Sequence, residues 1–179
     1  MPIDLKLNLR TNKFVFDKDI MENSDPQTVL SEHAKLNEMR FEIVEATLWV
    51  EQEFETYILK YLFPQQCEKS LFFQGYIIKT DLISFSSKRR ILLEILRKEK
   101  LIKIAKQTEL NELVIKIMNY RDAFTHGRFN KINNDAVLNF YQGGNQTLEI
   151  NQQNIDDIKR VFNHFYAIWN GIFESYLLK

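Results

Sequence analysis

Residues 25–63, DPQTVLSEHAKLNEMRFEIVEATLWVEQEFETYILKYLF, predict the long helix around which the fold is built. Ser24 or Asp25 can cap its first turn, Pro26 fits that turn, and Pro64 stops the helix. Apolar side chains recur along it at three- and four-residue spacing and form two stripes. The first contains Leu36, Met39, Ile43, Ala46, Val50, Phe54, Tyr57 and Tyr61, and the second contains Phe41, Val44, Leu48, Leu59 and Leu62. A helix that is apolar on two faces is typical of the centre of a bundle.

Further helical segments are expected along the rest of the chain. They lie at residues 67–74, in a short piece after a break at Gly75, and at 88–104, 108–126 and 155–178. Ser86 or Ser87 can cap the 88–104 segment, and Thr108 can cap the next one. Gly127 ends that helix because glycine adopts the left-handed conformation at low cost. The last segment repeats apolar residues three and four apart, which requires a helical partner.

Two other segments alternate apolar and polar residues, which is the pattern of half-buried strands. Residues 3–16 predict an N-terminal hairpin, and residues 137–150 predict another around Gly143-Gly144-Asn145. We therefore expect a mainly α fold, a helical bundle of about five helices. It forms a single domain over residues 1–179, with a helical core at 25–179, a hairpin insert at 137–150 and a β-hairpin extension at 1–20.

Composition excludes several classes of protein. The chain has five glycines and three prolines in 179 residues, well below average usage, whereas all-β sandwiches and Gly-rich nucleotide-binding folds need more turn glycines. Its one cysteine, Cys67, rules out an intramolecular disulfide and a Cys-based zinc site. No apolar run reaches the roughly 18 residues of a membrane span, and residues 1–10 lack a signal-peptide core. A soluble, cytoplasmic protein without a membrane partner is expected.

The segment NYRDAFTHGR, residues 119–128, concentrates the residues that could do chemistry. Asn119, Asp122 and His126 are three and then four residues apart, so they share one helix face. Arg121 lies about 140° around the helix from His126, and its long side chain could still reach the same site if another helix packs alongside. A polar stripe therefore ends an otherwise apolar helix close to solvent.

An Arg-Asp pair followed by three residues and a His (R-D-x-x-x-H), at the end of a late helix, resembles the signature of the HEPN superfamily. The surrounding arrangement is similar over residues 25–179: a long amphipathic helix, further helices, a motif helix that ends in His-Gly, a variable insert and a closing helix. The family more often has Asn where this chain has Asp122, and residues 1–20 fall outside the resemblance.

The resemblance implies a metal-independent endoribonuclease that needs no cofactor. In HEPN ribonucleases the RNA's own 2′-hydroxyl attacks the adjacent phosphate and leaves a 2′,3′-cyclic phosphate. His126 would transfer the proton, Arg121 would hold the phosphate oxygens, and Asp122 would orient or polarise His126. The residues that would bind substrate beside them are Asn119, Tyr120, Arg128 and Lys131.

Family members typically dimerise with their motif helices facing each other, so that each copy supplies half of a composite site. The resemblance therefore implies RNA and a second copy of the chain as partners. It also implies a role as a toxin or phage-defence component, with an antitoxin such as a minimal nucleotidyltransferase as a candidate partner.

Two alternatives stay open at this point. Many family members keep the fold without catalysis and act as modules that bind a partner protein or a nucleotide. The same residues also fit a structural role, in which His126 interacts with the helix dipole and Arg121 forms a solvated pair with Asp122.

Charge is distributed unevenly although 24 basic residues balance 24 acidic ones. Residues 22–55 contain nine Asp or Glu and two basic residues, whereas residues 88–106 contain eight Lys or Arg and two Glu. The basic segment is either an RNA-steering surface beside His126 or a solvated helix face. The acidic and basic regions could pair within the fold or across a dimer.

Three other sets of residues are assigned structural roles. The first set is Glu51, Glu53 and Glu55. Because these carboxylates are two residues apart, we expect them on different helix faces and at solvated positions. His33 and His164 lack metal-ligand spacing, so no metal site is expected. Trp49, Trp169 and most phenylalanines lie on apolar stripes, which predicts core positions rather than base-stacking ones.

Overall fold

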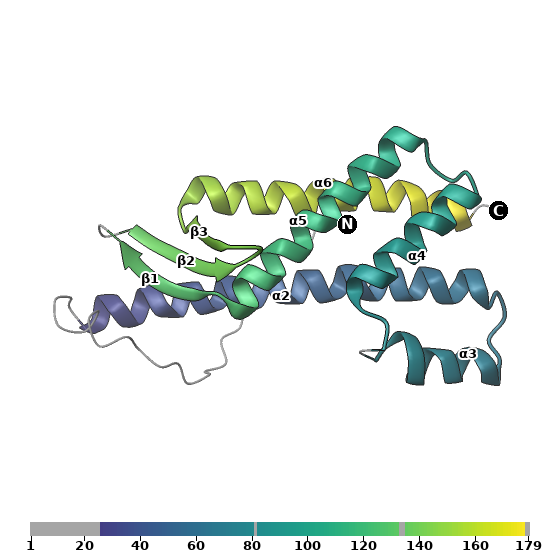
Figure 1. Ribbon diagram of the computed structural model, residues 1–179, viewed down its shortest axis with the longest axis horizontal. Coiled ribbons are helices and arrows are strands. Elements are labelled where there is room, and N and C mark those ends of the chain that lie inside the picture. The colour runs from purple at the N-terminus through teal and green to yellow at the C-terminus, as the bar shows by residue number, and fades with distance from the viewer. Residues whose placement is uncertain (1–25, 81, 133–134, 178–179) are drawn as a thin grey trace. The chain divides into compact units, whose positions relative to one another are not determined.

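The computed structural model of the chain describes residues 26–80, 82–132 and 135–177 (Figure 1). These residues form five α-helices, one π-helical segment and a three-stranded sheet. The elements are α2 (Pro26–Leu62), α3 (Glu68–Phe73), η1 (Gln74–Ile78), α4 (Phe85–Lys98), α5 (Ile104–His126), β1 (Arg128–Ile132), β2 (Asp135–Tyr141), β3 (Asn145–Glu149) and α6 (Gln152–Leu177). The predicted mainly α fold of about five helices is confirmed. The expected N-terminal hairpin, at residues 1–20, lies outside the described residues.

The chain divides into two compact units. The first consists of Met1–Ala46 and Asn119–Ile158, and the second of Thr47–Met118 and Lys159–Lys179. Helices α2, α5 and α6 each contribute residues to both units. None of the helices in the described part of the chain combines the length and apolar character needed to cross a membrane.

Aromatic side chains form the centre of the second unit. The Phe54 ring of α2 has its centroid 5.7 Å from that of Phe85, 6.0 Å from that of Phe165 and 5.4 Å from that of Trp169. All four residues are buried. The predicted core position of Trp169 is therefore confirmed, and the apolar stripes of α2 and α6 meet in this cluster.

Helix α4 begins and ends at different residues from those predicted. Its cap is Ser84, whose hydroxyl accepts the backbone N–H of Ser87 at 3.2 Å, so the prediction of Ser86 or Ser87 as the cap is wrong. The helix ends at Lys98 because Lys100 is left-handed, with φ of 51°. The amides of Lys100 and Leu101 then bond the carbonyls of Arg97 and Leu96 at 3.2 and 3.1 Å, respectively. These two hydrogen bonds supply donors to carbonyls that would otherwise have no hydrogen-bond partner at the end of the helix.

Two other boundary predictions are also wrong. Helix α5 begins at Ile104, so Thr108 lies inside it and donates its hydroxyl to the Ile104 carbonyl at 3.2 Å. Gly75 does not break the chain into two helices, because α3 continues directly into η1. In both places the helix continues through a residue that the sequence marked as a boundary.

The strands form an antiparallel sheet in the order β1-β2-β3, seen as neighbouring arrows in Figure 1. The predicted hairpin at residues 137–150 is confirmed as β2 and β3, and Tyr141 pairs with Asn145 across its loop. Gly143 and Gly144 occupy that loop with φ of 64° and 157°, which favours glycine. Strand β1 was not predicted. It places Arg128 opposite Asn139 in β2, so the chain passes from α5 almost directly into the sheet.

Candidate functional site

The predicted site residues of the motif occupy the last two turns of α5, in the first unit. Ala123 and Phe124 are fully buried there, and the Phe124 ring contacts Phe129 of β1 with centroids 6.3 Å apart. Arg121 is only partly buried and His126 is exposed. Buried apolar residues therefore fix a helix end whose polar residues remain accessible to solvent.

The guanidinium of Arg121 binds the carboxylate of its neighbour. Its Nε and Nη2 donate to Oδ1 of Asp122 at 3.0 and 2.8 Å. The two side chains are 29% and 50% exposed. An ion pair this accessible contributes only about 0–1 kcal/mol to stability. A phosphate that binds Arg121 would have to displace Asp122 from the guanidinium.

His126 is the last residue of α5. Within the described residues its imidazole makes no hydrogen bond, and the expected contact from Asp122 is not formed. Asp122 binds Arg121 instead, although it lies one helical turn before His126. Both imidazole nitrogens are therefore open to a substrate or to another chain.

Arg40 of α2 fixes the end of the motif helix, and sequence reasoning did not single it out. Its Nη2 donates to the Gly127 carbonyl at 2.8 Å, and its Cζ lies 4.9 Å from the centre of the Phe129 ring. Burial lowers the pKa of Arg40. A cation at the C-terminal end of a helix also interacts favourably with the helix dipole. The cap of α5 is thus supplied from a helix about ninety residues away in sequence.

Glycine is required at position 127 because there is no room for a side chain, and not because the backbone is left-handed. Its φ lies outside the left-handed region, so the predicted reason for this glycine is wrong. A Cβ at this position would lie 2.2 Å from the Ala123 carbonyl oxygen and 2.6 Å from Cδ1 of Leu138. The backbone at the end of α5 therefore packs directly against strand β2.

The remaining predicted site residues surround this helix end. Asn119 and Tyr120 are half-buried. Burial, with a smaller contribution from the charge of Asp157, raises the pKa of Tyr120, so its phenol remains a hydrogen-bond donor. Arg128 is exposed in β1. Lys131 pairs with Ala136 through the backbone, and its side chain lies outside the described part of the chain.

The basic segment 88–106 belongs to the second unit and is not a continuous solvated face. Lys88 is buried, and its Nζ lies 2.6 Å from Oε1 of both Glu51 and Glu55 in α2. The ammonium of Lys88 is therefore not available to RNA, and both predictions for the rest of the segment stay predictions. Arg89 donates to Asn111 at 2.8 Å, whereas Arg97 forms an exposed pair with Glu94.

The predicted solvated positions of the three α2 carboxylates are wrong. Glu55 is buried, Glu51 is largely buried, and the two share Lys88. Glu53 accepts the indole N–H of Trp169 at 3.1 Å. The acidic and basic regions therefore pair within the fold at least through Lys88.

Of the other two histidines, the structure describes the side chain of His164 only. Nε2 of His164 lies 3.0 Å from Oε1 of Glu109, and both side chains are well exposed. The side chain of His33 lies outside the described part. Across the described ranges, no three His, Cys, Asp or Glu side chains gather closely enough to hold a metal ion.

Comparison of the chain with models of known protein families, with curated proteins and with solved structures found no match.

Proposed function

We propose that the end of α5 is one half of a ribonuclease site of the HEPN type, completed by a second copy of the chain. One observation carries this proposal. A helix end fixed by Arg40 and Gly127 presents an accessible guanidinium and an exposed histidine that engages no other described residue. These are the two side-chain types that transesterification of RNA requires.

Each side chain has a separate task in this reaction. An imidazole nitrogen of His126 takes the proton of an RNA 2′-hydroxyl, whose oxygen then bonds to the adjacent phosphorus. The guanidinium of Arg121 leaves Asp122 and binds two phosphate oxygens as negative charge develops on them. The bond from phosphorus to the 5′-oxygen breaks, that oxygen takes a proton from solvent, and a 2′,3′-cyclic phosphate remains.

Helix geometry supports a site shared between two copies. His126 lies five positions after Arg121, so their Cα atoms lie about 7.5 Å apart along α5 and about 140° apart around it. Side chains this divergent converge poorly on one phosphate. A second motif helix facing the first would place the Arg121 of one copy near the His126 of the other.

Cleavage in the presence of EDTA tests the reaction. The purified protein is incubated with single-stranded RNA and EDTA, and the products are analysed for 2′,3′-cyclic phosphate ends. We expect cleavage by the unaltered chain, and losses of about 10²–10⁴-fold in His126→Ala and Arg121→Ala. RNA with a 2′-deoxy nucleotide at the cleaved position should resist.

Two variants serve as matched controls. His164→Ala removes another exposed histidine, and Arg97→Ala removes another exposed arginine paired with a nearby carboxylate. Both should cleave like the unaltered chain. Equal cleavage by His126→Ala and His164→Ala would contradict the proposal.

The second candidate function is a non-catalytic module that binds a partner protein or a nucleotide through the same helix end. The Arg121–Asp122 pair favours it, because Asp122 neutralises the guanidinium and so reduces the positive charge available to a reacting phosphate. RNA binding that depends on Arg121, without cleavage under any condition, would support this function over the first.

A further inference from the structure

The exposed face of α3 and η1 carries large apolar side chains, although the inner face of the same segment is also largely apolar. Six of its exposed residues recur at three- and one-residue intervals, namely Glu68, Leu71, Phe72, Gly75, Tyr76 and Lys79, and Lys69 is exposed at their edge. The inner face contains Ser70 and Ile78, both buried, and Phe73, whose ring lies 5.6 Å from that of Phe63. We call the six exposed residues the α3–η1 face.

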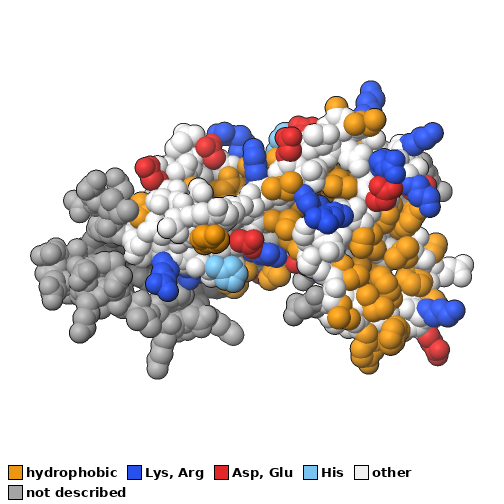
Figure 2. Space-filling view, in the orientation of Figure 1, with side chains coloured by type: hydrophobic (Ala, Val, Ile, Leu, Met, Phe, Trp, Pro, Cys, Tyr) orange, Lys and Arg blue, Asp and Glu red, His pale blue; other side chains and the backbone are white. Residues whose placement is uncertain are grey.

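The apolar side chains of this face are large and open to solvent. Leu71, Phe72 and Tyr76 are 50%, 58% and 67% exposed, and the rings of Phe72 and Tyr76 stack with centroids 5.1 Å apart. Figure 2 shows hydrophobic side chains gathered over α3 and the adjoining part of α4. A contiguous exposed apolar patch of this kind marks an interaction surface.

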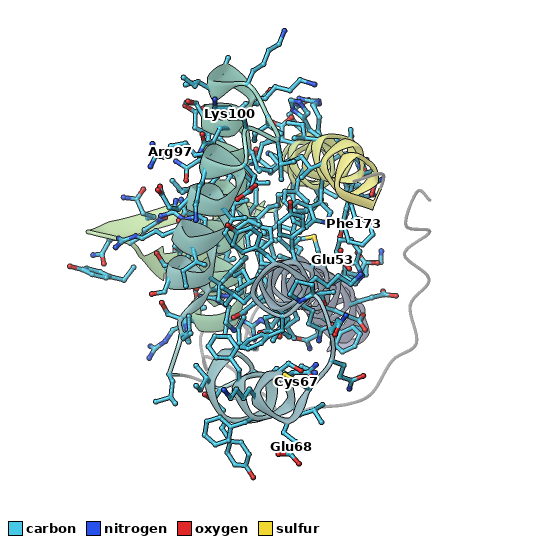
Figure 3. The ribbon with its side chains drawn as sticks, turned by 90° about the vertical axis from the view of Figure 1, so that its right-hand side faces the viewer. Glu53, Cys67, Glu68, Arg97, Lys100 and Phe173 are labelled. Atoms are coloured by element: carbon cyan, nitrogen blue, oxygen red, sulfur yellow. The ribbon has the colours of Figure 1, made fainter. Side chains whose placement is uncertain are left out.

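The charges of the α3–η1 face determine which partner fits it. Glu68 lies at one end, with the exposed Lys69 beside it, and Lys79 lies at the other end, about 16 Å away along the helical axis. Within the described residues neither Glu68 nor Lys79 forms an ion pair, and Figure 3 shows Glu68 pointing away from the other helices of its unit. When two copies run antiparallel, Glu68 of each copy would lie opposite Lys79 of the other, so this pair forms twice about the two-fold axis.

Gly75 gives the face room for a close neighbour. A Cβ at this position would meet nothing within 4 Å, so no contact within the chain requires a glycine there. Glycine inside a helix costs about 0.5–1 kcal/mol relative to alanine. In an antiparallel pair centred between Phe72 and Gly75, the Phe72 ring of each copy would lie on the bare backbone at Gly75 of the other.

We propose that the α3–η1 face binds the same face of a second copy of this chain, antiparallel and about a two-fold axis. Glu68 of each copy pairs with Lys79 of the other, and the apolar side chains fill the centre. A lipid surface would contact the apolar side chains equally well, but it gives no reason for the bare backbone at Gly75. This interface lies in the second unit and does not depend on the proposed ribonuclease site.

Sedimentation equilibrium of the full chain measures this association. The unaltered chain should dimerise, and Phe72→Asp should raise the dimer Kd about 100-fold or more, because a central aromatic anchor is lost from both copies. Ile104→Asp, at another highly exposed apolar position, should leave Kd unchanged. Glu68→Lys should raise Kd about tenfold, and Glu68→Lys combined with Lys79→Glu should restore it.

Cysteine pairing tests the antiparallel register. In a Cys67→Ser background, Glu68→Cys and Lys79→Cys are prepared as two separate single variants. Under mild oxidation each alone should remain uncrosslinked, and a mixture of the two should form a disulfide-linked dimer. Within one chain the two positions are too far apart for a disulfide.

Four results would overturn the proposal. They are a monomer at all concentrations up to about 1 mM, no response of Kd to Phe72→Asp, failure of the charge swap to restore Kd, and binding to phosphatidylcholine–phosphatidylglycerol vesicles without self-association. Association through the motif helices, which the proposed function requires, would leave a dimer that none of these substitutions dissociates, and both interfaces together would give species larger than a dimer. The two interfaces are therefore distinguished by the same measurements.

Discussion

Replacing Lys88 with methionine should destabilise the protein severely. Lys88 is 3% exposed, and its ammonium lies 2.6 Å from a carboxylate oxygen of Glu51 and of Glu55, whose side chains are 16% and 9% exposed. Methionine is of similar length but leaves both carboxylates without their cation. Breaking a buried ion pair by removing one partner costs about 3–5 kcal/mol. For a chain of this size, this loss corresponds to a fall in Tm of roughly 6–20 °C.

The triple variant Lys88→Met with Glu51→Gln and Glu55→Gln isolates the cause. It removes the uncompensated charges, so we expect it to recover most of the loss and to lie within about 1–2 kcal/mol of the unaltered chain. Lys98→Met changes an exposed lysine of the same helix and should stay within about 0.5 kcal/mol. Thermal and urea unfolding followed by circular dichroism measure all three.

Alkaline pH provides a second measurement on the same group. Burial disfavours the ammonium, but the hydrogen bonds and charges of Glu51 and Glu55 outweigh burial and raise the pKa of Lys88. Its contribution to stability is therefore complete below the ordinary lysine value of 10.5 and is lost as the pH rises through the higher value of the folded protein. The stability difference between the unaltered chain and Lys88→Met should be constant near neutral pH and shrink above about pH 10.5. An unchanged Tm in Lys88→Met, or no recovery in the triple variant, would refute this reasoning.

Three further substitutions give stability changes of known sign. Gly127→Ala should destabilise by about 1–3 kcal/mol in urea unfolding, because its Cβ would overlap the Ala123 carbonyl oxygen; unchanged stability would show that the helix end is not tightly packed. Lys100→Gly should raise stability by about 0.5–1 kcal/mol, since φ of 51° favours glycine, and a lower Tm would contradict this. Asn151→Ala should cost about 1 kcal/mol because the Asn151 side chain caps α6 by accepting the Asn154 N–H at 2.9 Å. A Tm equal to that of the unaltered chain would argue against that cap.

The end of a helix was predicted well where one residue prevents the helix from continuing. Pro64 has no N–H, so the bundle's longest helix had to end just before it, and α2 ends at Leu62. The N-cap of α4 was predicted wrongly because three nearby serines can each cap a helix. Sequence alone does not distinguish Ser84, Ser86 and Ser87 until the backbone geometry is known. Lys100 gave no sign of a helix end, since a non-glycine residue rarely adopts positive φ.

The buried carboxylates show how a correct rule led to a wrong prediction. Adjacent members of Glu51, Glu53 and Glu55 lie on different helix faces, as their spacing of two requires. Glu51 and Glu55, however, are four residues apart and share a face, and Lys88 approaches that face from another helix. The spacing of four was visible in the sequence, but the cation that makes burial favourable was not.

At the candidate site, the sequence predicted the helix end but not what fixes it. The arrangement of Arg121, Asp122 and His126 on the last turns of α5 follows from local helical spacing. Arg40 and the contact of Gly127 with Leu138 depend on segments distant in sequence, so no local pattern indicates them. The pairing of Asp122 with Arg121 rather than His126 depends on side-chain conformation, which spacing leaves open.

Mixing two inactive variants tests the shared ribonuclease site most directly. Arg121→Ala and His126→Ala are purified separately, combined in equal amounts, and assayed for RNA cleavage with EDTA present. If each site combines the Arg121 of one copy with the His126 of the other, half of the dimers in the mixture contain one intact site. We therefore predict about a quarter of the activity of the unaltered chain. No activity in the mixture, with full activity in the unaltered chain, would contradict a site shared between two copies.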